Sequence, residues 1–144
     1  MAKKKTQRQP IYRRLGTVDA DKFIDLIPLD SHSKLPKSRM FFDKRVRLTS
    51  SRYKVYATKG CVCAECGLHG KFFALEQSLS QKTDKFHFNL YGYSRYGEEI
   101  MLTVDHIIPK SKGGTDDLDN KQCLCFRCNN KKGDKLPSEV VVQK

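Results

Sequence analysis

Two pairs of cysteines in the sequence have the spacing of a metal site. Cys63 and Cys66 are separated by two residues, and so are Cys125 and Cys128. This spacing lets two thiolates at a tight turn reach one ion, and two such pairs complete a tetrahedral sulfur site for Zn²⁺. The long segment between the pairs is no obstacle, because the entropy cost of closing a loop grows only logarithmically with its length. We therefore predict a structural zinc ion.

Two further cysteines and a histidine complicate the choice of ligands. Cys61 and Cys123 each lie two residues before a pair, and His69 follows the first pair closely. Gly67 comes directly after the first pair, as a tight turn around a metal needs, so we favour the two pairs as ligands. Cys61 and Cys123 are then most simply small buried apolar residues, but the sequence leaves their part in metal binding open. His69 remains an alternative ligand.

A zinc ion with four thiolates is coordinatively closed, so any hydrolytic chemistry needs other residues. Asp105 and His106 end an apolar run and precede a glycine-rich loop. Together they offer a hard metal ligand beside an imidazole that titrates near neutral pH. For this dipeptide alone, a salt-bridged pair at the end of a strand is the competing interpretation.

The residues that follow the dipeptide form a longer pattern. The sequence DHIIP begins at Asp105, Gly113 and Gly114 come next, Asn120 stands five residues before a cysteine, and CNNKKG begins at Cys128. With the zinc pairs, and in this order, these motifs resemble the HNH endonuclease family over about residues 63–134. The resemblance implies a ββα-metal fold, in which two strands and a helix surround a catalytic ion. Residues 1–60 lie outside it, and the segment 68–101 is longer than the family pattern needs.

The resemblance also implies a role for each residue of the site. His106 would be the general base, Asp105 a metal ligand, and Asn120 the residue that orients the loop and the imidazole. Asn129 would be the second metal ligand, at a position where many members have histidine, so the chain is an HNN variant. An amide oxygen suits Mg²⁺ or Mn²⁺ better than softer ions. The expected phosphate contacts are Lys132, for which a solvated helix charge is the alternative, Lys110 and Arg127.

The predicted reaction is hydrolysis of a DNA phosphodiester with a single divalent ion. Neutral His106 would take a proton from water in line with the phosphorus, while the ion neutralises charge on the phosphoryl and leaving oxygens. By resemblance, the products would carry 5′-phosphate and 3′-hydroxyl ends. Neighbouring side chains of an ideal strand point to opposite faces, so Asp105 and His106 can share a site only if the strand is distorted. We predict such a distortion.

Local signals predict the elements that would position these groups. Thr49, Ser50 and Ser51 are typical of a helix start, and a short helix through about Thr58 would end at Gly60. Alternation over residues 86–91 and the extended run 100–108 predict a β-hairpin, and the apolar pattern of 15–30 predicts a docked strand or short helix. Residues 121–124 lead to a helix over 126–132, followed by a glycine. The aromatics of 67–101 could stack bases, but packing a half-buried sheet is the favoured interpretation.

The predicted fold class is α+β: a small ββα-metal core stapled by a four-cysteine zinc, with an aromatic-rich β-hairpin and a basic N-terminal extension. We divide the chain into an extension, 1–48, and a nuclease domain, 49–144, whose zinc and catalytic core spans about 61–134. Within the extension, residues 1–14 carry no acid and are predicted to be a mobile basic arm. The stretch 34–54 has a single acid, Asp43, and is predicted to face phosphates.

The overall charge indicates a nucleic-acid partner. The 144 residues include 28 Lys and Arg against 16 Asp and Glu, a formal net charge of +12. A membrane-surface protein is disfavoured, because no basic amphipathic helix and no apolar span stands out. The N-terminus is too polar for a signal peptide, so we expect a reducing, cytoplasmic location in which clustered cysteines bind metal.

Two other functions fit parts of the sequence. The main alternative is a non-catalytic zinc module that grips DNA or RNA, which composition and cysteines fit equally well. A structural zinc protein with protein partners is the third, disfavoured by the charge of +12. We expect double-stranded DNA as the partner, and a monomer or a homodimer. Nicking and double-strand cutting are both open.

Overall fold

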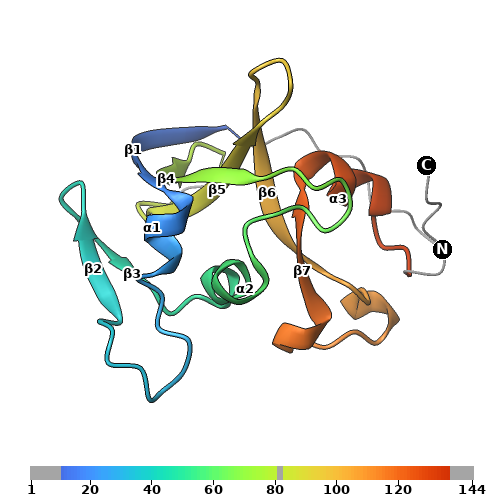
Figure 1. The fold of residues 1–144 in the computed structure, drawn as a ribbon, viewed down its shortest axis with the longest axis horizontal. Coiled ribbons are helices and arrows are strands. Elements are labelled where there is room, and N and C mark those ends of the chain that lie inside the picture. The colour runs from blue at the N-terminus through green and yellow to red at the C-terminus, as the bar shows by residue number, and fades with distance from the viewer. Residues whose placement is uncertain (1–10, 81–82, 137–144) are drawn as a thin grey trace.

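The computed structural model describes residues 11–80 and 83–136. Its main body is an antiparallel five-stranded sheet in the order β1-β4-β5-β6-β7 (Figure 1). The strands are β1 (Tyr12–Asp19), β4 (Gly70–Ser78), β5 (His87–Tyr93), β6 (Glu99–His106) and β7 (Lys121–Cys125). A separate two-stranded ribbon pairs β2 (Ser38–Phe41) with β3 (Lys44–Arg47). The helices are α1 (Ala20–Ile24), α2 (Ser51–Lys59) and α3 (Phe126–Lys132), and two 3-10 turns, η1 (Lys110–Lys112) and η2 (Leu118–Asn120), lie between β6 and β7.

The predicted basic arm coincides only partly with what the structure describes. Residues 1–10 of the arm lie outside the described residues. For the last residues of the arm the prediction is wrong, because β1 begins at Tyr12 and pairs along β4. Arg14 explains why: its guanidinium lies 2.9 Å from Glu76 and 2.7 Å from Glu99, so carboxylates distant in sequence fix this basic segment to the sheet. The apolar pattern of 15–30 docks as predicted, as the rest of β1 and as α1.

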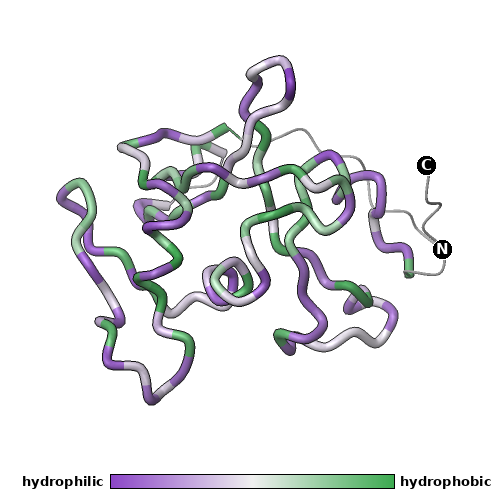
Figure 2. Tube along the Cα trace, viewed as in Figure 1, coloured by the Kyte–Doolittle hydropathy of each residue, from purple (hydrophilic) through white to green (hydrophobic). Residues whose placement is uncertain are grey.

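Aromatic side chains build the core under the sheet. The ring of Phe23 from α1 lies 4.3 Å from that of Phe73 and 4.6 Å from that of Phe88, centroid to centroid, and all three residues are fully buried. Figure 2 shows hydrophobic segments gathered in the middle of the molecule and hydrophilic ones along the outer loops. Most of the aromatic-rich segment therefore packs the sheet, as favoured from the sequence. Tyr93 and Tyr96, at 49% and 75% exposure, are the exceptions among its described tyrosines and phenylalanines.

Helix α2 forms where the capping signals predict it. The Ser50 hydroxyl accepts a hydrogen bond from the Arg52 N–H, and Gly60 ends the helix at a φ of 93°. Tyr53 and Tyr56 face inward, where the hydroxyl of Tyr53 accepts a 2.9 Å bond from the backbone N–H of Phe88. The helix is thereby held against β5, and it also packs against β7.

Strands β6 and β7 and helix α3 form a hairpin followed by a helix, the order expected of a ββα-metal core. The observed α3 spans the predicted residues and ends at Gly133. The pairing of β6 with β7 runs without interruption from Leu102 opposite Cys125 to His106 opposite Lys121. A β-bulge, one form of the predicted distortion of β6, is therefore absent, because each position from Leu102 to His106 has its own partner in β7. The α+β class itself is confirmed.

The helices described here are all short. None of those within residues 11–80 and 83–136 has the length and apolar character needed to cross a membrane.

Candidate active site and metal centre

The four cysteines of the two pairs come together in space. The sulfurs of Cys63, Cys66, Cys125 and Cys128 all lie within 4.8 Å of one another. Cys66 Sγ and Cys125 Sγ are 3.8 Å apart, which matches the separation of about 3.8 Å expected for two thiolates at 2.3 Å from a tetrahedral zinc. The backbone N–H of Cys66 donates to Cys63 Sγ at 3.5 Å, and that of Cys128 donates to Cys125 Sγ at 3.4 Å. The cluster has the donor set and the size for a zinc ion.

The residues that competed for the ligand positions lie outside the cluster. Gly67 takes a φ of 78°, and its N–H donates to Cys63 O, which closes the first turn as predicted. His69 is exposed and pairs with Val62 in an isolated bridge. Burial raises the pKa of Cys61 to about 11 and raises that of Cys123 as well, so both sulfurs keep their protons. The sequence favoured small buried residues for both: Cys123 is buried, whereas Cys61 is half-buried.

Within the cluster, Cys63 is the cysteine that loses its proton most easily. The thiol of Cys125 donates a hydrogen bond to the sulfur of Cys63, which lowers the pKa of Cys63 to about 4. Burial raises the pKa of Cys128 to about 12. Binding of zinc must therefore displace the remaining protons, as metal binding to thiols always does.

Asp105 faces α3 and is held there by a lysine. Its carboxylate is 8% exposed and lies 3.0 Å from Lys132 Nζ and 3.2 Å from Gln122 Nε2. The same ammonium donates to the backbone carbonyl of His106 at 2.9 Å. Lys132 is itself 7% exposed, so a contact with phosphate would require it to leave both partners.

Asn129 of α3 lies over the same face of β6, beside Thr103, two positions before Asp105. Its amide Nδ2 donates to Thr103 Oγ1 at 2.9 Å, and Thr103 shares the α3 face with Asp105 because side chains alternate along a strand. Asn129 also borders a cavity of about 260 Å³ between β5, β6 and α3, whose polar lining includes Arg52, Asn89 and Asn130. The oxygen donors predicted for the divalent ion thus share one side of the hairpin.

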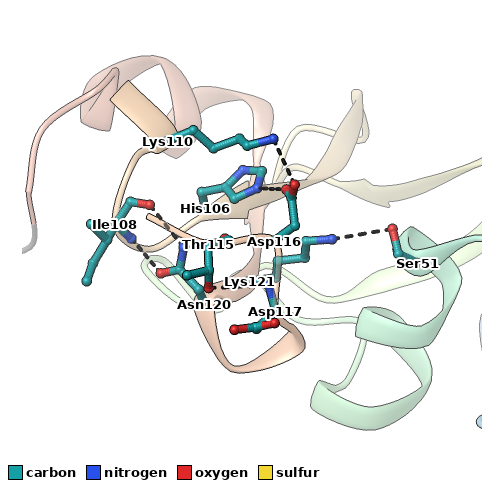
Figure 3. Close-up of polar contacts among 9 residues, drawn as sticks. All are labelled: Ser51, His106, Ile108, Lys110, Thr115, Asp116, Asp117, Asn120 and Lys121. Carbon is teal, nitrogen blue, oxygen red and sulfur yellow. Dashed lines mark hydrogen bonds and ion pairs between the residues drawn. The ribbon is translucent and has the colours of Figure 1, made fainter. Parts of the chain in front are cut away.

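The imidazole of His106 points to the loop that follows β6. Its Nε2 lies 2.8 Å from Asp116 Oδ1, and Lys110 Nζ lies 2.8 Å from the other oxygen of that carboxylate (Figure 3). The Lys110 ammonium and then His106 hold the pKa of Asp116 at about 2, so the carboxylate stays ionised. Asp116 is not among the site residues predicted from the sequence, because no spacing rule relates it to the histidine.

The loop is clamped by Asn120. Its Oδ1 accepts from the Ile108 N–H at 2.9 Å, and its Nδ2 donates to the carbonyls of Ile108 at 3.0 Å and Thr115 at 2.8 Å (Figure 3). Gly114 passes so close that a Cβ there would lie 1.7 Å from the oxygen of Ile108. Asn120 therefore holds the loop that carries Asp116, and none of its hydrogen bonds among the described residues reaches the imidazole of His106.

The other two predicted phosphate contacts, Lys110 and Arg127, lie at the protein surface. Lys110 is 60% exposed and pairs with Asp116, and Arg127 is 59% exposed and lies 3.5 Å from Glu98. Both ion pairs are at the surface, where such pairs contribute little stability and exchange readily. Either cation can turn to a phosphate without uncovering a buried charge.

Comparison with known proteins points to the same part of the chain. Residues 94–135 match the sequence model of the family described as HNH endonuclease. That range holds β6, the loop, β7 and α3, with Asp105, His106, Asn120 and Asn129 in the order quoted above. The resemblance to this family is thereby confirmed, and it implies nuclease activity in general and a nucleic-acid substrate. No curated protein and no solved structure gave a significant match to the chain.

Proposed function

We propose that the protein is a metal-dependent DNA endonuclease that hydrolyses phosphodiester bonds with His106 as general base. The observation that carries the proposal is the HNH endonuclease match over residues 94–135, together with an imidazole at the end of β6 whose Nε2 is fixed by a carboxylate. By this proposal the substrate is double-stranded DNA, the products carry 5′-phosphate and 3′-hydroxyl ends, and the zinc cluster is structural.

The donor set on the α3 face suits one hard divalent ion. Asp105 supplies a carboxylate and Asn129 an amide oxygen, which are ligands of Mg²⁺ and Mn²⁺. Asp105 already holds a cation, since Lys132 Nζ lies 3.0 Å from its oxygen. When bound, the divalent ion would neutralise charge on the phosphoryl and leaving oxygens.

The proton transfer is assigned to a particular atom. An ionised carboxylate at Nε2 favours the tautomer that carries its proton there, donated to Asp116. Nδ1 of His106 is then the unprotonated nitrogen, and it takes the proton of the attacking water. Because the ring of His106 and the carboxylate of Asp105 flank the regular end of β6 from opposite faces, the scissile phosphate would lie across the end of the strand.

A second function has one observation in its favour. Lys132 neutralises Asp105 in a buried ion pair, which would also suit a non-catalytic zinc module that binds DNA or RNA. The two functions differ in whether cleavage depends on a divalent ion.

The test is cleavage of supercoiled plasmid by the purified protein with Mg²⁺ or Mn²⁺, with chelator added in a parallel reaction. His106→Ala should lower the rate on the order of 10² to 10⁴-fold, because it removes the base. His69→Ala, an exposed histidine outside the site, is the matched control and should cut normally. Zinc content and thermal unfolding of each variant confirm that it is folded. An undiminished rate for His106→Ala would remove His106 from the proposed role, and nicked and linear products separate single-strand from double-strand cutting.

A further inference from the structure

The β2–β3 ribbon presents a positive face that is exposed among the residues that the structure describes. Side chains alternate in the ribbon, so Ser38, Met40, Arg45 and Arg47 share one face, with Ser38 opposite Arg47 and Met40 opposite Arg45. Arg45 and Arg47 are exposed, and Met40 is 55% exposed. In Figure 1 the ribbon lies at the left edge of the molecule, beside α1.

The other face fixes the ribbon to the body. Val46 is 3% exposed, and the ring of Phe41 lies 4.9 Å from that of Phe88, centroid to centroid. At the tip, Phe42 takes a φ of 49°, which is unusual for a bulky residue. Its ring packs against β1 at Gly16, where a Cβ would come within 2.5 Å of it. The outer cations are therefore carried by a fixed element, and binding need not order a loose hairpin.

Among the described residues, no carboxylate forms an ion pair with the two arginines of this face. Within residues 11–80 and 83–136, the ion pairs of the structure involve neither Arg45 nor Arg47, and each of these arginines only donates to a neutral hydroxyl. By contrast, Arg14, Lys110, Arg127 and Lys132 each lie beside a carboxylate. The outer face of the ribbon thus has the charge that an extended polyanion would complement.

The ribbon is connected to the candidate active site through α2. Arg47 Nε donates to Thr49 Oγ1 at 2.9 Å, two residues before α2 begins at Ser51. Ser51 Oγ in turn lies 3.4 Å from Lys121 Nζ (Figure 3), and Lys121 stands opposite His106 across the hairpin. Helix α2 therefore lies between the ribbon and the end of β6 (Figure 1).

We propose that the outer face of the β2–β3 ribbon is a docking surface for duplex DNA, with Arg45 and Arg47 on backbone phosphates on the far side of α2 from the end of β6 (Figure 1). This inference rests on the proposed endonuclease function and names the surface that would hold its substrate. The ribbon lies outside the residues that match the HNH endonuclease family, so it would add to the binding by the catalytic segment.

The test separates binding from cleavage. Binding of a labelled DNA duplex is measured with the His106→Ala protein at several salt concentrations, so no substrate is consumed. Replacing Arg45 and Arg47 together by Gln should lower the slope of log affinity against log salt by about 2, which is about 30-fold in affinity at 0.15 M salt. The matched control replaces Lys22 and Arg95 by Gln, which removes the same charge from α1 and from the β5–β6 turn and should leave the slope nearly unchanged.

Cleavage by the same ribbon variant with His106 restored gives the second readout. We expect a higher KM with kcat retained, because the ribbon holds DNA and does not touch the reacting atoms. An unchanged salt slope, or an equal loss in the control, would overturn the assignment, and equal affinity for an RNA duplex would overturn the choice of DNA. If DNA binds through the ribbon but is never cut, the endonuclease proposal fails and the docking surface stands.

Discussion

At the scale of single residues, the site is defined by what each face of β6 contacts. Asp105 is enclosed by Lys132 and Gln122, whereas the ring of His106 is held by Asp116 from the following loop. The chemistry of a general base depends on which ring nitrogen keeps its proton. Asp116 is therefore the residue through which the loop would act on the imidazole.

The first prediction at this scale concerns Asp116 as a positioning residue. Asp116→Ala should lower kcat about 10- to 100-fold with little change in KM, because it removes the acceptor that fixes the tautomer of His106. Asp116→Glu should recover part of the loss, and Asp117→Asn, a neighbouring loss of one charge, should not reproduce it. The ¹⁵N shifts of the His106 ring give a direct check: proton occupancy unchanged between Nε2 and Nδ1 in Asp116→Ala would contradict this role.

At the scale of elements, those with a local signal could be predicted and those with distant partners could not. Helix α2 follows from Ser50 and Gly60, and α3 ends at a glycine, since caps are encoded within a few residues of the helix. The attachment of β1 could not be seen, because Arg14 pairs with Glu76, 62 positions away. The zinc pairs were predictable, because their ligands repeat a fixed spacing.

The part of the site that the sequence could not predict lies in the loop after β6. The expected distortion of β6 followed from requiring Asp105 and His106 to face the same way, but pairing with β7 continues without a register shift to His106. Asp116 reaches His106 only because Asn120 folds the loop back on Ile108, which is a tertiary outcome of several hydrogen bonds. The roles of Asp105 and Asn129 at a divalent ion remain predictions.

A prediction for this loop follows from Gly114. Gly114→Ala places a methyl group against the carbonyl of Ile108, at 1.7 Å before relaxation, so the backbone must move and take Asp116 with it. We expect nuclease activity to fall on the order of 10²-fold, as for a displacement of about 1 Å in a catalytic group. Gly113→Ala is the control, because it strains a φ of 89° but meets no atom. Equal activity of the two variants, with normal zinc content, would show that the loop does not position the base.

At the scale of the whole molecule, the cysteine cluster joins segments that are far apart in the chain. Cys63 and Cys66 lie in the turn between α2 and β4, and Cys125 and Cys128 lie at the junction of β7 with α3. One backbone bond, from Ala64 N to Cys123 O at 2.8 Å, also crosses this junction. A metal here would thus fix the base of α3, the helix that carries Asn129 and Lys132.

Removal of one zinc ligand should therefore unfold the molecule as well as release the ion. Structural zinc contributes about 10 kcal/mol or more in small zinc domains, which is comparable to the whole stability of about 5 to 15 kcal/mol of an ordinary domain. Cys66→Ala is the sharpest variant, because Cys66 is exposed and does not cap a helix, whereas Cys125 caps α3. We expect it to lose zinc by elemental analysis and to show no cooperative melting.

Cys61→Ala, outside the cluster, should keep one zinc per chain and melt within a few degrees of the parent. A Cys66→Ala protein that retained its zinc and its melting transition would mean that this quartet is not the ligand set.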